Sequence, residues 1–312
     1  MSRCLVAGME RRGDDYISTI YPLDLTTGKP GEKLFELEGT VSALSRFQIH
    51  YSDAEEDLGA RKNLGVREDL EYLMLGQRHT IQVRSLSTPG SREKVIRMNQ
   101  PGRANRFDGY NPRFNYVSII QKNFHQKNPL QEKPVLEPVF DLEQVLVASH
   151  DKYGLLAVPL QEFADRDVVE IDTAKGGGPG DRLLVLPGDN NDFIRANVVE
   201  NKVYVAKGRM IYQVDFAASK DNWPQWEITG LLDNERITCF AVQGKDVQGE
   251  DTQRKEMVAG TSCGSLWKYR QSGWHKLDQK VGNVKNLAIA GGKIVYTMEH
   301  NNFTNLYEWA GA

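Results

Sequence analysis

Apolar residues along this chain recur as a repeated two-strand unit. In each copy an apolar run ends in a small residue or a polar turn, and a second apolar run follows. The clearest copies are residues 203–206 followed by 210–214, and residues 257–260 followed by 265–269; looser copies occupy 4–23, 72–83, 146–158 and 294–309. A hairpin that repeats at intervals of tens of residues is typical of radial or solenoid folds. The pattern therefore predicts an all-β repeat architecture.

The spacing of the hairpins predicts the number of repeats. Equivalent positions on the second strand of each hairpin are Tyr21, Gln82, Leu156, Tyr212, Trp267 and Tyr307, with steps of 40 to 74 residues. A four-stranded propeller blade needs about 40 to 50 residues, and the excess lies in loops. The longest step has room for another blade, with strands at 114–120 and 135–140. We therefore predict a single domain over residues 1–312, a six- or seven-bladed β-propeller of four-stranded antiparallel blades.

Apolar runs on either side of the hairpins predict the remaining strands. Innermost strands are expected at 41–44, 193–198, 237–242 and 284–289, and alternating outer strands at 33–37, 94–97, 167–171, 224–228 and 274–277. Tyr21, Tyr212, Trp267 and Tyr307 are then expected on equivalent third strands. The last copy shows three strands, so we expect the N-terminal segment to complete it and close the ring, which removes open sheet edges. A short helix within 51–72 is an alternative reading of that acidic stretch.

One stretch carries a family resemblance. Residues 19–30 contain a strand-like run that ends at Asp24 and is followed by a Thr27-Gly28 turn. An outer strand is then expected within 34–39. This order resembles a blade of the WD-repeat family, although Gly-His and Trp-Asp signatures are missing from every copy. The resemblance covers about 20 residues and implies a divergent member of the β-propeller superfamily.

Composition narrows the class of protein. The chain is 40% hydrophobic and 26% charged, values typical of a globular protein, and its net charge is −3. That charge argues against a protein that coats nucleic acid with its whole surface. The net charge does not exclude local basic patches.

Cysteine usage and hydropathy predict a cytoplasmic protein. The three cysteines, Cys4, Cys239 and Cys263, form an odd and sparse set that favours free thiols over a disulfide framework. We expect Cys239 and Cys263 to be a pair of buried apolar thiols. No apolar signal region follows the first residues, and no apolar run is long enough to span a membrane.

The most uneven charge lies in residues 92–127, where eight Lys and Arg residues accompany two acids and several aromatic residues. Such mixing can hold phosphate and stack bases, or it can form a polar loop between blades. The residues expected to bind a partner here are Arg103, Arg106, Arg113, Tyr110 and Lys122. Residues 51–70 and 243–256 are charged loop insertions, the first of them strongly acidic.

The sequence contains no recognisable phosphate-binding, metal-binding or catalytic motif. Residues 176–180 are glycine-rich but lack the Lys-Ser/Thr pair of a phosphate loop, and 189–192 lack the spacing of a calcium loop. The six histidines show no metal-ligand spacing. The innermost strands offer Arg195, Asn197, Lys285 and Asn286, which suit a hydrated channel or an anion better than acid/base cleavage. We therefore expect no cofactor, no metal site and no catalytic residue.

These observations favour a non-catalytic propeller that serves as a scaffold for protein–protein interactions, as a subunit of a larger complex. Two alternatives remain open. One is a propeller that binds or hydrolyses a small molecule or glycan at its channel mouth. The other is a propeller associated with nucleic acid through residues 92–127.

Overall fold

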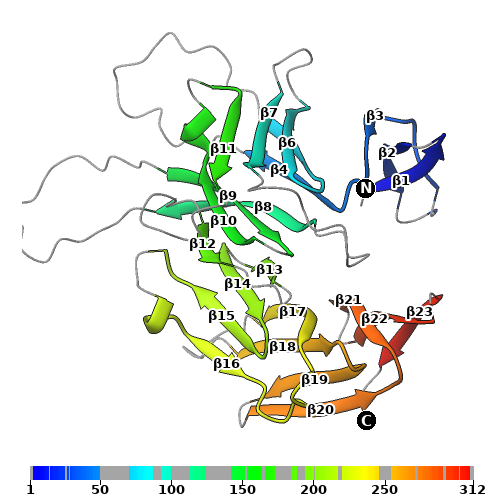
Figure 1. The fold of residues 1–312 in the computed structure, drawn as a ribbon, viewed down its shortest axis with the longest axis vertical. Helices are drawn as coiled ribbons and strands as arrows, with labels where there is room; N and C mark the ends of the chain where they lie inside the picture. Colours follow the sequence, from blue (N-terminus) through cyan, green and yellow to red (C-terminus); the bar gives the residue numbers. More distant parts are fainter. Residues whose placement is uncertain are drawn as a thin grey trace, which may run out of the picture. The chain divides into compact units, whose positions relative to one another are not determined.

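The computed structural model describes most of the predicted strands. The described residues are 3–13, 15–24, 27, 29–49, 70–86, 93–99, 113–123, 142–151, 153–163, 166–172, 184–187, 194–199, 201–216, 220–245, 254–270, 273–290, 293–301 and 303–309. The chain divides into two compact units, residues 1–146 with 158–175 and residues 147–157 with 176–312. Figure 1 shows the strands coloured along the chain.

Two sheets lie within the first unit. The first sheet has the order β1-β2-β3, and the second has the order β11-β7-β6-β5-β4. Their strands are β1 (Arg3–Arg12), β2 (Asp15–Asp24), β3 (Phe35–Glu38), β4 (Ala43–Ile49), β5 (Leu70–Gly76), β6 (Thr80–Ser85), β7 (Lys94–Asn99) and β11 (Val168–Asp172).

The third sheet has the order β12-β10-β9-β8, and the unit boundaries pass through β9 and β10. Its strands are β8 (Phe114–Asn123), β9 (Leu142–His150), β10 (Gly154–Pro159) and β12 (Leu184–Pro187), with a 3-10 turn at Leu160–Phe163 after β10. Phe114–Asn123 is therefore the innermost strand of this sheet and not part of a seventh blade. The other strand proposed for that blade, 135–140, lies outside the described residues.

Three sheets lie within the second unit, with the orders β13-β14-β15-β16, β17-β18-β19-β20 and β21-β22-β23. Their strands are β13 (Ile194–Val199), β14 (Lys202–Lys207), β15 (Met210–Val214), β16 (Gln225–Glu227), β17 (Ile237–Lys245), β18 (Arg254–Thr261), β19 (Ser265–Arg270), β20 (Gly273–Gln279), β21 (Asn283–Ala290), β22 (Lys293–His300) and β23 (Phe303–Trp309). A 3-10 turn at Lys220–Asn222 precedes β16.

The six sheets confirm the predicted fold class, an all-β propeller, and the lower of the two predicted blade numbers. All six predicted hairpins form, and no α-helix occurs among the residues the structure describes. Tyr21, Tyr212, Trp267 and Tyr307 lie on β2, β15, β19 and β23, the equivalent strands of their sheets. Closure of the ring by the N-terminal segment stays a prediction.

The WD-like stretch folds as its resemblance implies. At the end of β2 the Asp24 carboxylate accepts a hydrogen bond from the Thr27 N–H at 3.3 Å, and the Asp24 N–H donates to the Lys29 carbonyl. The chain then returns as β3, which pairs with β2 from Ile17 to Ile20. This is the strand, turn and outer strand that the sequence predicted.

The outer strand expected at 167–171 forms, but it joins a different sheet. β11 pairs with β7 in parallel and adds a fifth strand to the second sheet, whereas β12 takes the outer position of the third sheet. Val169 and Ile171 alternate with charged residues, and they are buried beside Ile96 and Met98 of β7. Burial of this apolar face explains why the strand joins β7.

Core packing lies between consecutive sheets. In the first unit Ile20 and Leu37 of the first sheet pack against Leu73 and Leu75 of the second. In the second unit Ile237 and Phe240 belong to a cluster that joins the fourth and fifth sheets. Val258, Leu266, Val284 and Met298 belong to another cluster, which joins the fifth sheet to the sixth. The first and second sheets, the fourth and fifth, and the fifth and sixth thus bury apolar side chains against each other, as propeller blades do.

Candidate functional site

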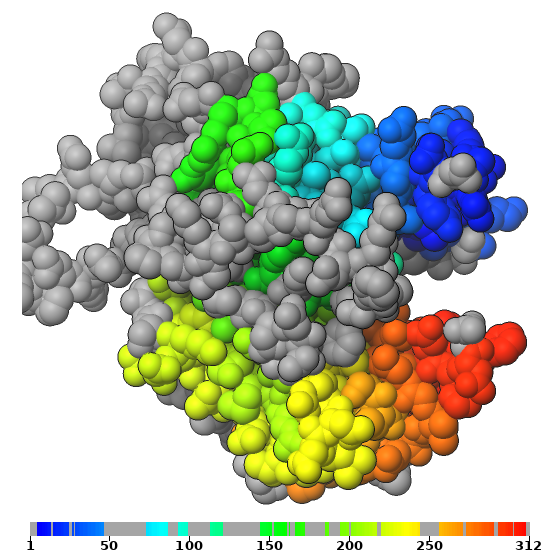
Figure 2. Space-filling model, in the orientation of Figure 1, coloured from blue at the N-terminus to red at the C-terminus, as the bar shows by residue number. Residues whose placement is uncertain are grey.

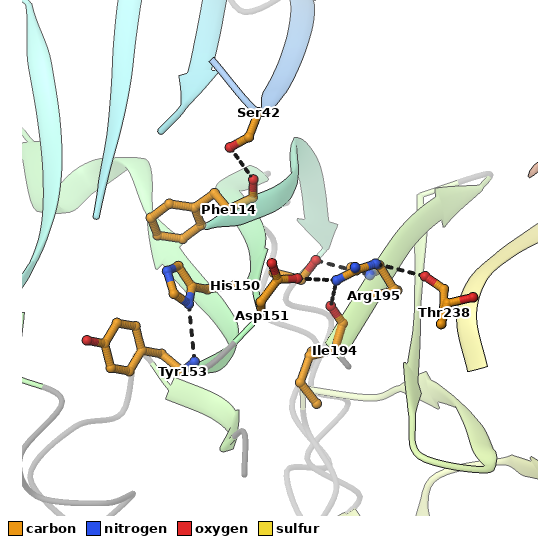
Figure 3. A network of polar contacts seen from close by, with 10 residues as sticks. Ser42, Phe114, His150, Asp151, Tyr153, Ile194, Arg195 and Thr238 are labelled. Atoms are coloured by element: carbon orange, nitrogen blue, oxygen red, sulfur yellow. Dashed lines mark hydrogen bonds and ion pairs between the residues drawn. The ribbon is translucent and has the colours of Figure 1, made fainter. Parts of the chain in front are cut away.

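A hydroxyl group joins the inner strands of the second and third sheets. Ser42, next to β4, places its Oγ 2.6 Å from the Phe114 carbonyl oxygen and 3.2 Å from the Gly76 carbonyl oxygen (Figure 3). Gly76 ends β5, and a Cβ atom there would lie 2.9 Å from both the Ala43 and the Phe114 Cβ atoms. The junction therefore needs a glycine on one strand and a short hydroxyl on the other.

The same arrangement recurs between the fifth and sixth sheets. Thr238 places its hydroxyl within hydrogen-bond distance of the Val284 carbonyl and 3.2 Å from the Gly260 carbonyl oxygen. A Cβ atom on Gly260 would lie 2.4 Å from the Val284 Cγ1 atom and 2.9 Å from the Cys239 Sγ atom. Hydroxyl, glycine and apolar partner thus occupy equivalent positions in the two junctions.

Arg195 has a structural role in the junction between the fourth and fifth sheets. Its guanidinium forms an ion pair with Asp151 and donates hydrogen bonds to the Thr238 carbonyl at 2.9 Å and the Ile194 carbonyl at 3.1 Å (Figure 3). The Asp151 side chain is only 5% exposed. Arg195 therefore neutralises a buried carboxylate, and the anion-binding role suggested by the sequence does not apply to it.

The other inner-strand candidates are also engaged or lie apart. Lys285 forms an ion pair with Glu299 at 2.6 Å, and Asn286 donates to the Thr297 hydroxyl at 3.2 Å. Both are exposed, whereas Asn197 is half-buried on β13. These side chains do not assemble a site with Arg195.

The second buried carboxylate, Glu235, stabilises the entry to β17. It accepts hydrogen bonds from the Thr261 hydroxyl and from the Leu232 N–H. Burial is the largest single effect and raises the pKa of Glu235, but the hydrogen bonds together outweigh it and lower that pKa. An ionised, fully bonded carboxylate of this kind is suited to holding a turn and poorly suited to proton transfer.

Three turns of the fifth and sixth sheets line an open groove of about 670 Å³. Its walls are residues 262–263 after β18, residues 279–283 from the end of β20 to the start of β21, and residues 299–301 at the end of β22. Gly264 and Gly282 have positive φ angles, and Cβ atoms there would lie 1.9 Å from the Lys280 oxygen and 2.8 Å from the Glu299 oxygen. Glycine at these two positions lets the turns approach closely enough to form the groove.

Lys280 is held in place at the edge of the groove. Its ammonium lies 2.9 Å from an Asp278 carboxylate oxygen and 5.3 Å from the centre of the Tyr307 ring. The lysine lowers the pKa of Asp278, which also accepts a hydrogen bond from the Tyr296 hydroxyl at 3.0 Å. Burial, followed by that bond to Asp278, raises the pKa of Tyr296. The cation is thus positioned while its side chain stays 38% exposed.

The groove combines a buried acceptor with an exposed apolar side chain. The Asn283 Oδ1 atom is buried and has no hydrogen-bond partner within the described structure. Such an atom lowers the stability of the free protein until a donor reaches it. Val281, on the same wall, is 78% exposed. A ligand that donates a hydrogen bond and carries an apolar group fits this combination.

The two cysteines whose side chains are described, Cys239 and Cys263, are free and differ in accessibility. Cys239 is buried, and burial raises the pKa of its thiol to about 12, whereas Cys263 lines the groove and is partly exposed. The sequence suggested two buried thiols, and this is wrong for Cys263. Its place in a surface turn explains the difference.

We expect a thiol reagent to distinguish these two cysteines. At pH 8 in the folded protein, Cys263 should be labelled in minutes, and Cys239 should stay unlabelled because it is neutral and inaccessible. Peptide mapping by mass spectrometry gives the result. Denatured, unreduced protein should show all three thiols. Equal labelling of Cys239 and Cys263 in the folded state would contradict the described burial.

Most of the predicted partner-binding residues lie outside the described residues. Arg103, Arg106 and Tyr110 are among these, so their predicted role is untested. Arg113 is exposed just before β8, and Lys122 belongs to β8 itself. Nucleic-acid binding has no support among the described residues.

The charged insertions are described only at their ends. Leu70 begins β5, and residues 51–69 lie outside the described residues. Residues 243–245 and 254–256 continue the hairpin of β17 and β18, with Gln243 opposite Glu256, so this insertion is shorter than predicted. The glycine-rich run at 176–180 is not described.

No metal-binding cluster is found in the part of the chain that the structure describes. Among the same residues, the buried charged side chains are Asp151 and Glu235, both in structural contacts. Among the described residues, no helix is long and apolar enough to cross a membrane.

Comparison with known proteins finds similar folds among solved structures. No family model and no curated protein matches the sequence. Among solved structures, BBS1N in complex with ARL6DN, soaked with lead, is 9% identical with a TM-score of 0.47, covering 95% of this chain and 75% of that one. The mercury-soaked crystal of that complex gives 11% and 0.44, covering 91% and 71%. Chaetomium thermophilum Sqt1, bound to the N-terminus of ribosomal protein L10, gives 14% and 0.41, covering 95% and 79%.

Proposed function

We propose that this protein is a non-catalytic β-propeller scaffold that binds a peptide segment of a partner protein in the groove at residues 262–263, 279–283 and 299–301. The observation that carries the proposal is the groove itself, with its buried, unpartnered Asn283 Oδ1 atom and its exposed Val281 side chain. A peptide supplies an apolar side chain for Val281, and a small opening of the turn at Asn283 would bring a peptide N–H to the buried acceptor.

The charge of the groove favours a neutral segment. Lys280 is paired with Asp278, and Glu299 is paired with Lys285. Both charges are therefore compensated within the protein, and the groove does not require a charged ligand. The volume of about 670 Å³ is within the usual range of ligand sites and has room for a few residues. A small interface of this kind is typical of transient contacts within a larger assembly.

The non-catalytic part of the proposal rests on how the buried polar groups are used. Asp151 and Glu235 hold inner-strand junctions and turns, where proton transfer would break structural contacts. The fold neighbours include proteins crystallised with protein partners, BBS1N with ARL6DN and Sqt1 with ribosomal protein L10. We further propose a cytoplasmic subunit of a larger complex, supported by the free thiols of Cys239 and Cys263.

Replacing Val281 should remove the partner without unfolding the protein. Val281→Asp places a carboxylate beside the Asn283 acceptor, and the side chain is 78% exposed, so we expect a change in stability below about 0.5 kcal/mol. Affinity enrichment from a lysate of the source organism, followed by quantitative mass spectrometry, should lose at least one wild-type partner about tenfold, a change of about 1.4 kcal/mol.

The matched control is Leu232→Asp. Leu232 is also an exposed apolar residue of the second unit, at 57%, and it does not line the groove. This variant should keep every partner of the wild type. Identical recovery by wild type and Val281→Asp would overturn the proposal, as would the loss of the same partners in both variants.

A further inference from the structure

The sixth sheet ends in an open strand edge. β23 pairs with β22 over the whole of Phe303–Trp309, and its other edge has no strand beside it in the described structure. The fourth and fifth sheets each carry an outer strand at that position, β16 and β20. The residues of β23 belong to the red end of the chain in Figure 2.

β23 lacks the features that normally protect an edge. Protective features are short length, charges, proline and bulges. β3 has four residues with two glutamates, β16 has three residues, and the ladder of β20 contains a register shift. β23 has seven residues, a regular ladder and one charged side chain, Glu308, which is paired with Lys293 at 2.8 Å.

Its side chains are also unusually exposed for their type. Phe303 is 73% exposed and Leu306 is 71% exposed. Large apolar side chains on a long, regular and weakly charged edge favour pairing with another strand. The second sheet shows that an outer edge in this protein accepts an additional strand, since β11 pairs with β7 there.

We propose that β23 pairs with β23 of a second copy of this chain, giving a two-fold symmetric dimer with a continuous six-stranded sheet. Antiparallel pairing of Phe303–Trp309 with itself over its full length places Leu306 on the symmetry axis, opposite Leu306 of the second copy. Phe303 then lies opposite Trp309, and Thr304 lies opposite Glu308. The single charge never faces a like charge, and aromatic residues meet across the strands, both of which favour this register.

A second copy of β23 is the partner strand that this edge supports best. A two-fold interface must be self-complementary, and in this register Phe303 meets Trp309 while the single acid, Glu308, meets the neutral Thr304. The dimer does not use the groove, so it is independent of the proposed function. It uses the strand edge that ring closure by the N-terminal segment would occupy, so the dimer and that closure are alternatives. An interface of one strand pair is small, and we expect a dissociation constant on the order of micromolar.

Sedimentation velocity of the full chain from about 1 to 100 µM tests the dimer. Wild type should shift from monomer to dimer over this range. Leu306→Lys should stay monomeric, because two ammonium groups would meet on the axis, and Val281→Lys should dimerise like wild type. Wild type that stays monomeric at every concentration, or dimers unaffected by Leu306→Lys, would overturn the proposal.

Cysteine cross-linking tests the register. In a Cys263→Ser background, Leu306→Cys should form a disulfide-linked dimer under mild oxidation. The Cβ atoms of directly opposite residues in an antiparallel pair lie about 4.5–5.5 Å apart, which is close enough for a disulfide after a small adjustment. Thr304→Cys should not cross-link, because its partner would be Glu308. Cross-linking by Thr304→Cys without Leu306→Cys, or by neither variant, would contradict the proposed pairing.

Discussion

Gly260→Ala should cost about 3 kcal/mol of folding free energy, at the upper end of the usual effect of overpacking. The added methyl group would lie 2.4 Å from the Val284 Cγ1 atom, 2.7 Å from the Val284 Cβ atom and 2.9 Å from the Cys239 Sγ atom. Val284 is fully buried and β-branched, so it cannot turn away from the methyl group. Chemical denaturation monitored by tryptophan fluorescence gives the change.

Equivalent glycines in two other hairpins provide the matched series. In Gly76→Ala the nearest atoms would lie at 2.9 Å, so we expect a smaller loss of about 1–2 kcal/mol. In Gly8→Ala the nearest atom is the edge of the Tyr21 ring at 3.2 Å, and a change within about 1 kcal/mol of zero is expected. The predicted order of destabilisation is therefore Gly260, Gly76, Gly8. Equal effects at the three positions would show that the junction contacts do not decide stability.

Asp151→Ala should destabilise the protein by about 3–5 kcal/mol, because it leaves the Arg195 charge without its carboxylate in a mostly buried position. Arg195→Met should have a similar effect, since it leaves the Asp151 carboxylate uncompensated and removes donors to the Thr238 and Ile194 carbonyls. Thermal or urea unfolding of the single variants measures both losses.

The double variant separates the ion pair from general damage to the fold. If Asp151 and Arg195 stabilise the junction as a pair, Asp151→Ala with Arg195→Met should cost clearly less than the sum of the single changes. Additive losses would contradict the pairing. An exposed ion pair, Lys293 with Glu308, is the control, and its removal should change stability by at most about 1 kcal/mol.

Local patterns were enough to predict most of the strands. Hairpins such as Val203–Val214 form from neighbouring residues, and their apolar alternation decides which face is buried. The same pattern could not assign β11, because its partner β7 lies about 70 residues earlier and a parallel pair leaves no turn between them in the sequence. The short strand β12 was missed because its four residues carry too little periodicity.

The junctions and the groove were beyond local reasoning for a related reason. Asp151 and Arg195 are 44 residues apart, and three separate turns form the groove. A signal for the junctions was nevertheless present, since Gly8, Gly76 and Gly260 end the first apolar run of three hairpins. Glycine at a repeated strand position indicates close approach of another chain segment.

Site-specific photo-cross-linking from residue 281 tests most directly whether the groove binds a protein. A photoreactive phenylalanine analogue at Val281, irradiated in lysate of the source organism, should give a defined cross-linked product with a partner. The same analogue at Leu232, also exposed but outside the groove, should not give that product. No product from position 281, or the same product from both positions, would contradict the proposal that this propeller binds its partner in the groove.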